Sequence, residues 1–439
     1  MERVSVSHRP SPDRSSRAAR RLTALALAVA LGGTTLLAPA TADDRAGAHS
    51  HQRGPGSADG AGSTRLGVPR HSSDSALDDL SPRLRTTGCT GPRRKIDRSW
   101  RVARGIKARK WDRTDGDGNP MRVSLLTVNL ADRRIRFDYI GPRIIGNTRT
   151  TSSYAEWQGA TAAVNADFFD ISDTGAPLGI GIESGSGLLH GTKDGWVPEL
   201  GYQPAFWLRD GKAQIGELWT RVRMTQHPRW RLDAVNAPLV RKDDIGVYTR
   251  KWGSTSGVSV TDGEQGREVV IEKGRVVRNR RGLSANLKIR QAVLVGRGDR
   301  ARQLRSLEVG QRVTLRTRVG PVRPDVAISG DRPILEDGRT VVVNDTIKAP
   351  RTAVGIDRDA RRLHLLVVDG RQRSSCGATM VELARLMRGL GDDVALNFDG
   401  GGSSTMFARR AGGERGVINS PSDGSEREVA NVLGVFRRR

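Results

Sequence analysis

Alternation of apolar and polar side chains is the dominant pattern along this chain, and it predicts many short β-strands. Residues 121–130 and 134–140 alternate with a period of two, which is typical of half-buried strands, and we expect these two segments to pair. Similar runs continue through the middle of the chain, separated by turns rich in Gly and Asp. These runs are residues 160–169, 203–208, 268–272, 291–295 and 312–318.

The last third of the chain has the clearest pattern. Residues 351–357 and 363–369 are apolar runs joined by a polar turn, which predicts two paired strands. Thr379 opens a Thr-x-x-Glu capping box before apolar positions with helical spacing, and Gly391 follows where the helix would end. Residues 394–398 predict one more buried strand. We therefore expect an α+β fold, with helices packed on a mixed, largely antiparallel sheet in one large domain.

The N-terminal segment has the pattern of an export signal. An apolar run at residues 22–37 follows two arginines and ends in the small residues 40–42. This arrangement predicts a signal peptide over residues 1–42 and a secreted or cell-wall-associated, extracytoplasmic protein. An uncleaved signal that stays as a membrane anchor is the alternative, and the export route stays open.

A linker is expected between the signal peptide and the folded domain. Residues 43–97 are rich in Ser, Gly, Pro and Arg and show neither period, which predicts a disordered, basic segment before a domain at 98–439. Cys89 and Cys376 are the two cysteines of the sequence. In an oxidising compartment their pairing is the simplest outcome, although the sequence supplies no geometry for the bond.

Composition narrows the classes of partner. The chain has 73 basic and 48 acidic residues, a net charge of +25, so it should attract anionic wall polymers. The arginines are spread through every segment and aromatic residues make up only 4%, which argues against specific nucleic-acid binding. Walker, dinucleotide-binding, nucleophile-elbow and zinc-protease motifs are absent from the sequence. Nothing in the sequence requires a cofactor, and a divalent metal is not excluded.

The first candidate site begins at the end of the strand predicted at 394–398. Asp399 comes directly after that strand, and we expect it to act as nucleophile or base. Successive glycines allow backbone N–H groups to converge on an anion such as phosphate, although a plain glycine turn is the alternative. The expected phosphate-binding residues of this turn are Gly400, Gly401, Gly402, Ser403 and Ser404.

Three further strand ends carry polar side chains that suit the same chemistry. A carboxylate can act as acid, base or nucleophile, and an arginine can hold a phosphate through two hydrogen bonds. Asp369 and Asp167 are therefore further catalytic candidates, and we expect one cleft along the edge of the sheet. The expected substrate-binding residues at these strand ends are Asn165, Arg351, Thr352 and Arg371.

Four motifs in a fixed order give a resemblance to a known family. They are residues 163–170, 349–355, 367–371 and 396–404, and two closing segments follow at 417–421 and 427–431. Over residues 100–436 the chain resembles the phosphodiester glycosidase family. The family usually has two glycines where this chain has Ala166 and Asp167. The resemblance implies a hydrolase that cleaves the glycosidic C–O bond of a sugar 1-phosphodiester and releases a sugar and a phosphomonoester.

Two other functions stay open at this point. A metal-dependent phosphodiesterase would cleave the P–O bond instead, but it would need a His and Asp ligand cluster, whereas His190, His227 and His364 are isolated in the sequence. A non-catalytic module that binds anionic wall polysaccharide is the second alternative. The expected partner is a phosphodiester-linked glycan or sugar 1-phosphate conjugate, with no specific nucleic acid and membrane contact only through an uncleaved signal. The sequence identifies neither the sugar nor its aglycone.

Overall fold

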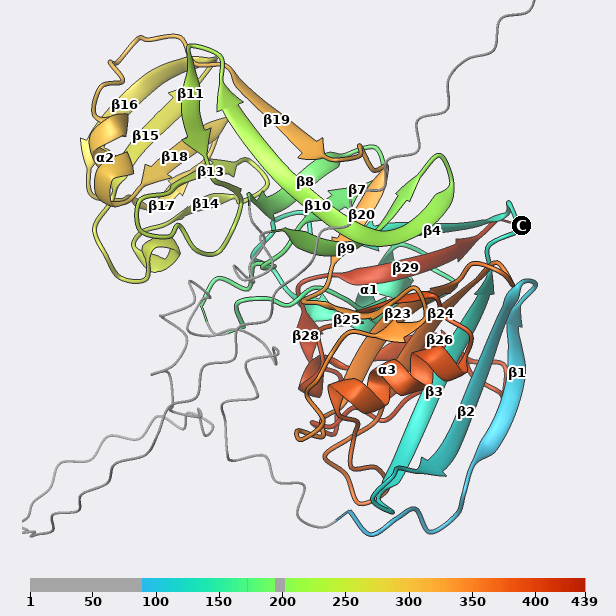
Figure 1. The fold of residues 1–439 in the computed structure, drawn as a ribbon. Coiled ribbons are helices and arrows are strands. Elements are labelled where there is room, and N and C mark those ends of the chain that lie inside the picture. Colours follow the sequence, from blue (N-terminus) through green and yellow to red (C-terminus); the bar gives the residue numbers. More distant parts are fainter. Residues whose placement is uncertain (1–88, 172, 194–201, 439) are drawn as a thin grey trace, which may run out of the picture. The chain divides into compact units, whose positions relative to one another are not determined.

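Short apolar runs and tight turns fold into antiparallel sheets in the computed structural model, which describes residues 89–171, 173–193 and 202–438 (Figure 1). Strands account for 48% and helices for only 9% of the structure. The expected α+β fold is therefore wrong, because the protein is mostly β. Only one described segment keeps the helical period over ten residues, whereas the Gly- and Asp-rich turns elsewhere close hairpins.

An eight-stranded sheet carries three of the four motifs. Its central strand β23 (Arg351–Asp357) lies between β24 (Arg362–Val368) and β25 (Val394–Phe398), so the ends of three motif-bearing strands are neighbours. The strand at 121–130 pairs with β24 and not with 134–140, so that expected hairpin is wrong. The other strands are β1 (Asp97–Ala103), β2 (Ile106–Thr114), β3 (Pro120–Asn129), β21 (Pro333–Glu336) and β22 (Arg339–Thr340).

Helix α3 (Met380–Gly389) covers one face of this sheet (Figure 1). It begins with the expected capping box, in which the Thr379 hydroxyl accepts from the Glu382 N–H and the Glu382 side chain accepts from the Thr379 N–H. Gly391 follows the helix with φ of +94°, a conformation that favours glycine. The helix buries Leu383 and Met387 against the strands, which fixes the loop before it.

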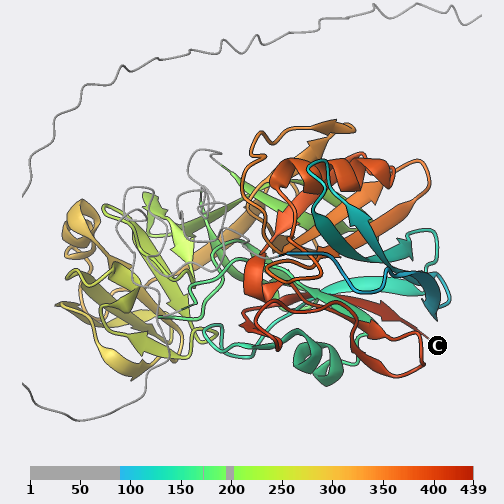
Figure 2. The ribbon, with the colours of Figure 1, turned by 90° about the horizontal axis from the view of Figure 1, so that it is seen from below.

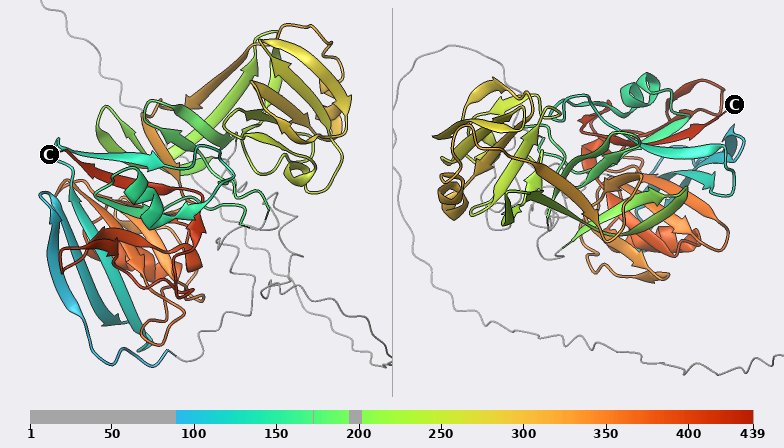
Figure 3. Two further views of the ribbon diagram at one scale, coloured as in Figure 1. Left: turned by 180° about the vertical axis from the view of Figure 1, so that it is seen from behind. Right: turned by 90° about the horizontal axis from the view of Figure 1, so that it is seen from above.

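A five-stranded sheet packs against the other face of the eight-stranded sheet. Val164 and Leu433 of the smaller sheet share a buried apolar cluster with Leu126 and Val354 of the larger one. Figure 3 shows the last strand beside an early one, since residues 134–140 pair with the chain's final described strand. In order the strands are β27 (Arg415–Val417), β26 (Met406–Arg409), β6 (Ala162–Asn165), β29 (Val432–Arg437) and β4 (Ile135–Ile140).

The middle of the chain forms a twelve-stranded sheet. Its longest strand, β10 (Lys212–Met224), pairs along its first half with β9 (Gln203–Arg209) and along its second half with β19 (Leu315–Gly320). The pair β12–β13 is the one parallel pair among the described strands. The remaining strands are β7 (Gly181–Glu183), β8 (Gly187–Thr192), β11 (His227–Leu232), β12 (Ala234–Val235), β13 (Ile245–Thr249), β15 (Arg267–Glu272), β16 (Arg275–Arg281), β18 (Ala292–Gly296) and β20 (Val326–Ser329).

Two small sheets and two short helices complete the described fold. The helix α1 (Thr151–Trp157) lies beside the five-stranded sheet (Figure 2), and α2 (Gly298–Leu304) packs on β18. The small sheets pair β14 (Ser254–Ser256) with β17 (Ala285–Lys288) and β5 (Arg149–Thr150) with β28 (Glu428–Val429).

The expected signal peptide and most of the expected linker lie outside the described residues, which begin at Cys89. Cys89 forms a disulfide with Cys376, with 5.5 Å between their Cα atoms. The N–H groups of Thr90 and Gly91 donate to the carbonyl of Arg373, so the start of the described chain is attached to the loop before α3. Within the described ranges, no helix combines the length and apolar character that a membrane crossing requires.

Candidate active site

Asn165 connects three of the sequence motifs. It ends β6 and is completely buried. Its Nδ2 donates to the carbonyl oxygen of Asp399 at 2.6 Å, while its Oδ1 accepts from the hydroxyl of Thr352 at 2.9 Å and from the N–H of Thr405 at 3.0 Å. One carboxamide therefore fixes the end of β6, the start of β23 and the turn after β25 at a single point.

The backbone around Asp399 strengthens this connection. The N–H of Asp399 donates to the carbonyl of Ala166 at 2.8 Å, and the N–H of Gly401 donates to the carbonyl of Pro350 at 2.9 Å. The Asp399 side chain is 1% exposed. The carboxylate expected to act as nucleophile or base is thus held in the interior by backbone contacts with two other motifs.

In the glycine turn, side-chain hydroxyls are better placed to bind a ligand than backbone N–H groups are. The N–H of Ser403 donates to Gly400 and that of Ser404 to Gly401, both within the turn, so these N–H groups and that of Gly401 are already engaged. By contrast, the hydroxyls of Ser403, Ser404 and Thr405 are buried and have no hydrogen-bond partner among the described residues. Buried hydroxyls normally have a partner, so these three suit a polar ligand or bound water.

An ion pair covers the far side of the turn. Arg427 donates to Asp423 at 2.9 Å, and a Cβ at Gly402 would fall 2.1 Å from the Arg427 guanidinium and 2.2 Å from the Asp423 carboxylate. Only glycine leaves room for this close approach. The turn is therefore fixed from both sides.

Asp167 is a buried acid with a strongly altered protonation. Its Oδ1 accepts from the Ser329 hydroxyl, and its N–H donates to Oδ1 of Asn431 at 3.0 Å. Burial raises the pKa of Asp167 to about 8, against the lowering effect of its hydrogen bonds with Ser329, Asn431 and Gly179. At neutral pH this carboxyl is therefore mainly protonated and can donate a hydrogen bond.

Two aromatic side chains extend the network around Asp167. Nδ1 of His190 donates to the carbonyl of Gly179 at 2.7 Å, so its Nε2 accepts from the Tyr139 hydroxyl at 3.0 Å. Asn431 donates to that same hydroxyl at 3.3 Å. Burial lowers the pKa of His190 to about 4 and raises that of Tyr139 well above its usual value. The network is thus neutral, and it fixes the orientation of Asn431 beside Asp167.

Arg351 and Asp331 are two buried ionisable residues near the strand ends that Asn165 connects. Arg351 is 4% exposed, and its Nε and Nη2 donate to the carbonyls of Ala378 and Ile347, each at 3.1 Å. Asp331 accepts from Asn397 at 2.8 Å. Burial raises the pKa of Asp331, and the positive charges of Arg332 and Arg351 oppose that rise. The guanidinium is therefore oriented by backbone carbonyls before any substrate arrives.

Asp369 belongs to a second, connected cluster. Its Oδ1 accepts from the N–H of Ser420 at 2.9 Å and from Nδ2 of Asn419 at 3.2 Å, and Asn419 also donates to the carbonyl of Ser404 at 2.9 Å. Burial raises the pKa of Asp369, while the nearby positive charge of Lys110 lowers it. Asn419 thus links Asp369 to the turn that follows Asp399.

A cavity of about 580 Å³ adjoins the Asp369 cluster. Asn419, Lys110 and Trp100 line it, together with Arg98 and Arg410. Its cations and its indole suit a phosphorylated sugar. Arg371, the other candidate of this strand end, is half-buried with φ of +55°, which places its backbone in the left-handed region.

One group of acids with metal-ligand spacing already has a cation. Asp115, Asp117 and Glu382 lie close enough to share an ion, but the ammonium of Lys348 contacts all three, at 3.0 Å from Asp117 and 3.6 Å from Glu382. The chain's own lysine therefore compensates their charge.

The sequence reasoning did not identify several residues that hold the site. Ser329 donates to the candidate Asp167, whereas Asn397 donates to Asp331, whose pKa is raised by burial and lowered by the nearby charge of Arg351. Ser329 and Asp331 are single polar residues in or beside a buried strand, and Asn397 lies within the motif at 396–404. Asn419 and Asn431 lie in the closing segments of the family pattern. That pattern was the one available signal for them.

Comparisons with known proteins agree with the motifs. The phosphodiester glycosidase family model matches residues 255–436, a range that contains three of the four motifs and both closing segments. A hypothetical protein from Synechocystis has a TM-score of 0.65 and 21% identity, covering 79% of this chain and 64% of that protein. A predicted exported protein from Burkholderia pseudomallei has a TM-score of 0.63 and 19% identity, covering 80% and 98%. At these identities the two structures establish the fold.

A third solved structure aligns with most of the chain but with a lower TM-score. It is the catalytic domain of zebrafish N-acetylglucosamine-1-phosphodiester alpha-N-acetylglucosaminidase, auto-inhibited by its pro-peptide, with a TM-score of 0.41, 16% identity and coverage of 84% and 95%. No curated protein matches the chain. The resemblance drawn from the motifs is confirmed by the family model: residues 255–436 match the phosphodiester glycosidase family.

Proposed function

We propose that this protein is an extracytoplasmic hydrolase that cleaves the glycosidic C–O bond of a sugar 1-phosphodiester. Water supplies the hydroxyl group of the released sugar, its second proton passes to a base or to solvent, and the phosphomonoester leaves as an anion. The observation that carries the proposal is the set of three hydrogen bonds made by Asn165, which joins the motif at 163–170 to two motifs inside the family match.

The residues divide naturally between the two halves of such a substrate. Asp399 is the candidate nucleophile or base at the sugar carbon, because it is a buried acid at the centre of the motifs. A phosphomonoester has a second pKa near ~6 and leaves with little protonation. Its charge needs donors instead, and Arg351 with the hydroxyls of Ser403 and Ser404 supplies them.

Asp167 has a different role in this proposal. Since burial raises its pKa to about 8, it carries a proton at neutral pH and can act as a hydrogen-bond donor or general acid. Asp369, with Arg371 on the same loop and Asn419 beside it, is the candidate for orienting the substrate at the adjoining cavity. Anionic wall polymers are the expected class of substrate or partner, because the chain carries a net charge of +25.

The test is hydrolysis in water labelled with ¹⁸O. The purified protein is incubated with a sugar 1-phosphodiester, and both products are analysed by mass spectrometry. Label in the sugar supports C–O cleavage. Label in the phosphate contradicts it and indicates a phosphodiesterase. Tight binding without any product, in a preparation that is folded by thermal melting, supports the non-catalytic module instead.

A further inference from the structure

An arginine-rich face on the twelve-stranded sheet is not used by the proposed reaction. Arg221 lies directly opposite Arg318 in the antiparallel pair β10–β19, and Arg223 lies opposite Arg316. Residues that are directly opposite in such a pair point to the same side of the sheet. The neighbouring strand β11 adds two more exposed arginines. The six members, here called the arginine face, are Arg221, Arg223, Arg229, Arg231, Arg316 and Arg318.

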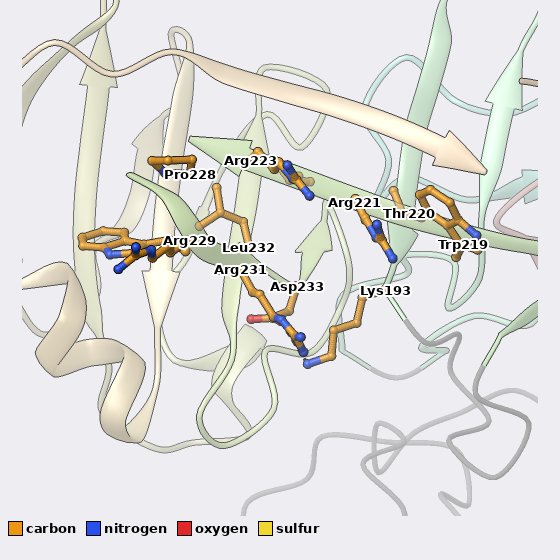
Figure 4. A pocket seen from close by; sticks show the side chains of 12 residues that line it. Lys193, Trp219, Thr220, Arg221, Arg223, Pro228, Arg229, Arg231, Leu232 and Asp233 are labelled. Carbon is orange, nitrogen blue, oxygen red and sulfur yellow. Dashed lines mark hydrogen bonds and ion pairs between the residues drawn. The ribbon is translucent and has the colours of Figure 1, made fainter. Parts of the chain in front are cut away.

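A cavity of about 460 Å³ opens in this face between β10 and β11 (Figure 4). The two strands are joined at Val222–Leu232 and at Met224–His227, so β11 uses five residue steps where β10 uses two. The additional residues bulge away from β10, and Pro228 among them has no N–H to donate. The hollow therefore follows from the register of the two strands.

The arginines of this face have no acidic partner among the described residues. Asp233, the one acid in the lining, accepts from Lys193 at 2.9 Å, as does Asp244. The six arginines form no ion pair with any residue that the structure describes. Thr220 also lines the cavity, but it alternates with Arg221 along β10, so its side chain faces the buried side of the strand and the residue is 2% exposed. Clustered positive charge without a described acidic partner favours a bound anion.

The aromatic residues of this face contact neighbouring side chains instead of offering open stacking surfaces. The guanidinium of Arg221 lies 4.5 Å from the ring centroid of Trp219, and a Cβ at Gly320 would fall 2.1 Å from the same indole. Trp230 stacks on His227 with 4.2 Å between ring centroids and 20° between planes. Nucleic-acid bases need free aromatic faces for stacking, so this surface favours phosphate groups over bases.

The spacing of the arginines fits a series of phosphates. Residues two apart on a strand are separated by about 6.6 Å, and adjacent strands by about 4.8 Å. Each guanidinium can bind one phosphate through two parallel hydrogen bonds. We propose that the arginine face binds a linear polymer of polyol or sugar units joined by phosphodiesters, with one phosphate in the cavity between β10 and β11. This inference concerns binding alone and goes beyond the proposed hydrolysis.

The experiment compares three versions of the full-length mature protein. One is unchanged, and a second carries Arg221→Gln, Arg223→Gln and Arg231→Gln in the arginine face. The third carries Arg104→Gln, Arg133→Gln and Arg281→Gln, which removes three exposed arginines elsewhere. Binding of poly(glycerol phosphate), poly-U RNA and polyglutamate is measured by fluorescence anisotropy over a range of salt. Thermal melts check that all versions fold, and hydrolysis of a short sugar 1-phosphodiester is measured in parallel.

We expect the unchanged protein and the control to bind poly(glycerol phosphate) alike, and the arginine-face variant to bind on the order of 10-fold more weakly. The slope of log affinity against log salt should fall by about 2 in that variant, since each lost phosphate contact removes about 0.7. Hydrolysis of the short substrate should not change. An equal loss of affinity in the control variant would show that binding depends only on the net charge of the protein and not on the arginine face. Tighter binding of poly-U, or equal binding of polyglutamate, would also overturn the inference, whatever the outcome for hydrolysis.

Discussion

The carboxamide of Asn165 donates to the backbone oxygen of Asp399 across 234 residues of sequence. This single contact sets the position of the carboxylate that the proposed reaction requires. Oδ1 of Asn165 accepts two further hydrogen bonds, from Thr352 and Thr405, so both polar atoms of this completely buried side chain have partners. It therefore holds the site together without needing to contact the substrate.

Replacing Asn165 should reduce both stability and turnover. Asn165→Ala leaves three buried polar groups without a partner, each worth roughly 1–3 kcal/mol, so the free energy of unfolding should fall by several kcal/mol. Thr352→Val removes one of the same bonds while keeping the side-chain shape, and should cost only about 1 kcal/mol. Urea unfolding measures the stability of both variants, and steady-state kinetics measure their turnover. Equal effects of the two substitutions would mean that Asn165 is not the central contact.

Asp399→Asn should abolish turnover while the protein stays folded. The substitution keeps the size of the side chain but removes the charge needed to attack or to take a proton, so kcat should fall by at least ~100-fold. Asp359→Asn, at an exposed acid, is the matched control and should have parental rates. Kinetics alongside thermal melts provide the test. Near-parental turnover in Asp399→Asn would move the catalytic role to Asp369 or Asp167.

Arg351→Lys should be milder than the loss of Asp399. Lysine keeps the positive charge but cannot donate to the carbonyls of Ala378 and Ile347 in the fixed geometry of the guanidinium. We expect a higher KM, because phosphate binding weakens, with a smaller change in kcat. Steady-state kinetics on the phosphodiester measure this. A fall in kcat as large as that of Asp399→Asn would assign Arg351 to the chemical step.

Asp167 should make stability depend on pH. Its pKa is about 8 in the folded protein and near ~4 in the unfolded chain, so the folded state holds a proton that the unfolded state releases between these values. Stability from this group is therefore full below about pH 4 and falls as pH rises toward 8. Asp167→Asn lacks this dependence, so its melting temperature should rise relative to the parent from pH 5 to 8. If the melting temperatures of the parent and of Asp167→Asn changed in parallel with pH, the raised pKa of Asp167 would be contradicted.

The disulfide should stabilise the loop that carries Asp369. Cys89 and Cys376 are separated by 287 positions, and Cys376 is buried, with its N–H donating to the carbonyl of Pro120. Replacing both cysteines by serine should lower the free energy of unfolding by about 2–5 kcal/mol. Chemical denaturation of the parent and the double variant measures this. Indistinguishable curves would show that the bond does not constrain the unfolded chain.

Local patterns predicted some elements accurately and failed where pairing depends on distant segments. The helix at α3 was predictable because its capping box and apolar spacing lie within about ten residues. By contrast, the pairing of residues 134–140 depends on β29, almost 300 positions later in the chain, and no local signal reveals that partner. The predicted α+β class was wrong for a related reason. The one clear helix pattern, at α3, led us to expect several packed helices, whereas most of the chain forms strands.

The candidate site shows the same division. Acids and glycines at strand ends could be chosen as candidates because they directly follow apolar runs, although a plain turn explains the same local pattern. That Asp399 and Asn165 are in contact could not be derived from either segment alone, although the order of the motifs implied a shared site. Ser329 was not predictable, because a single serine at the end of a buried strand has no distinctive pattern.

The internal position of β29 has a consequence for the nascent chain. This strand lies between β6 and β4, yet it is translated after all the other described strands. Until the ribosome reaches it, β4 and β6 each expose an unpaired edge, which is prone to associate with other chains. Asn165 likewise lacks its partners at residues 399 and 405 until those residues are synthesised, shortly before β29. A chain interrupted before β29 should therefore be inactive and aggregation-prone, and the protein gains its proposed activity only late in its own synthesis.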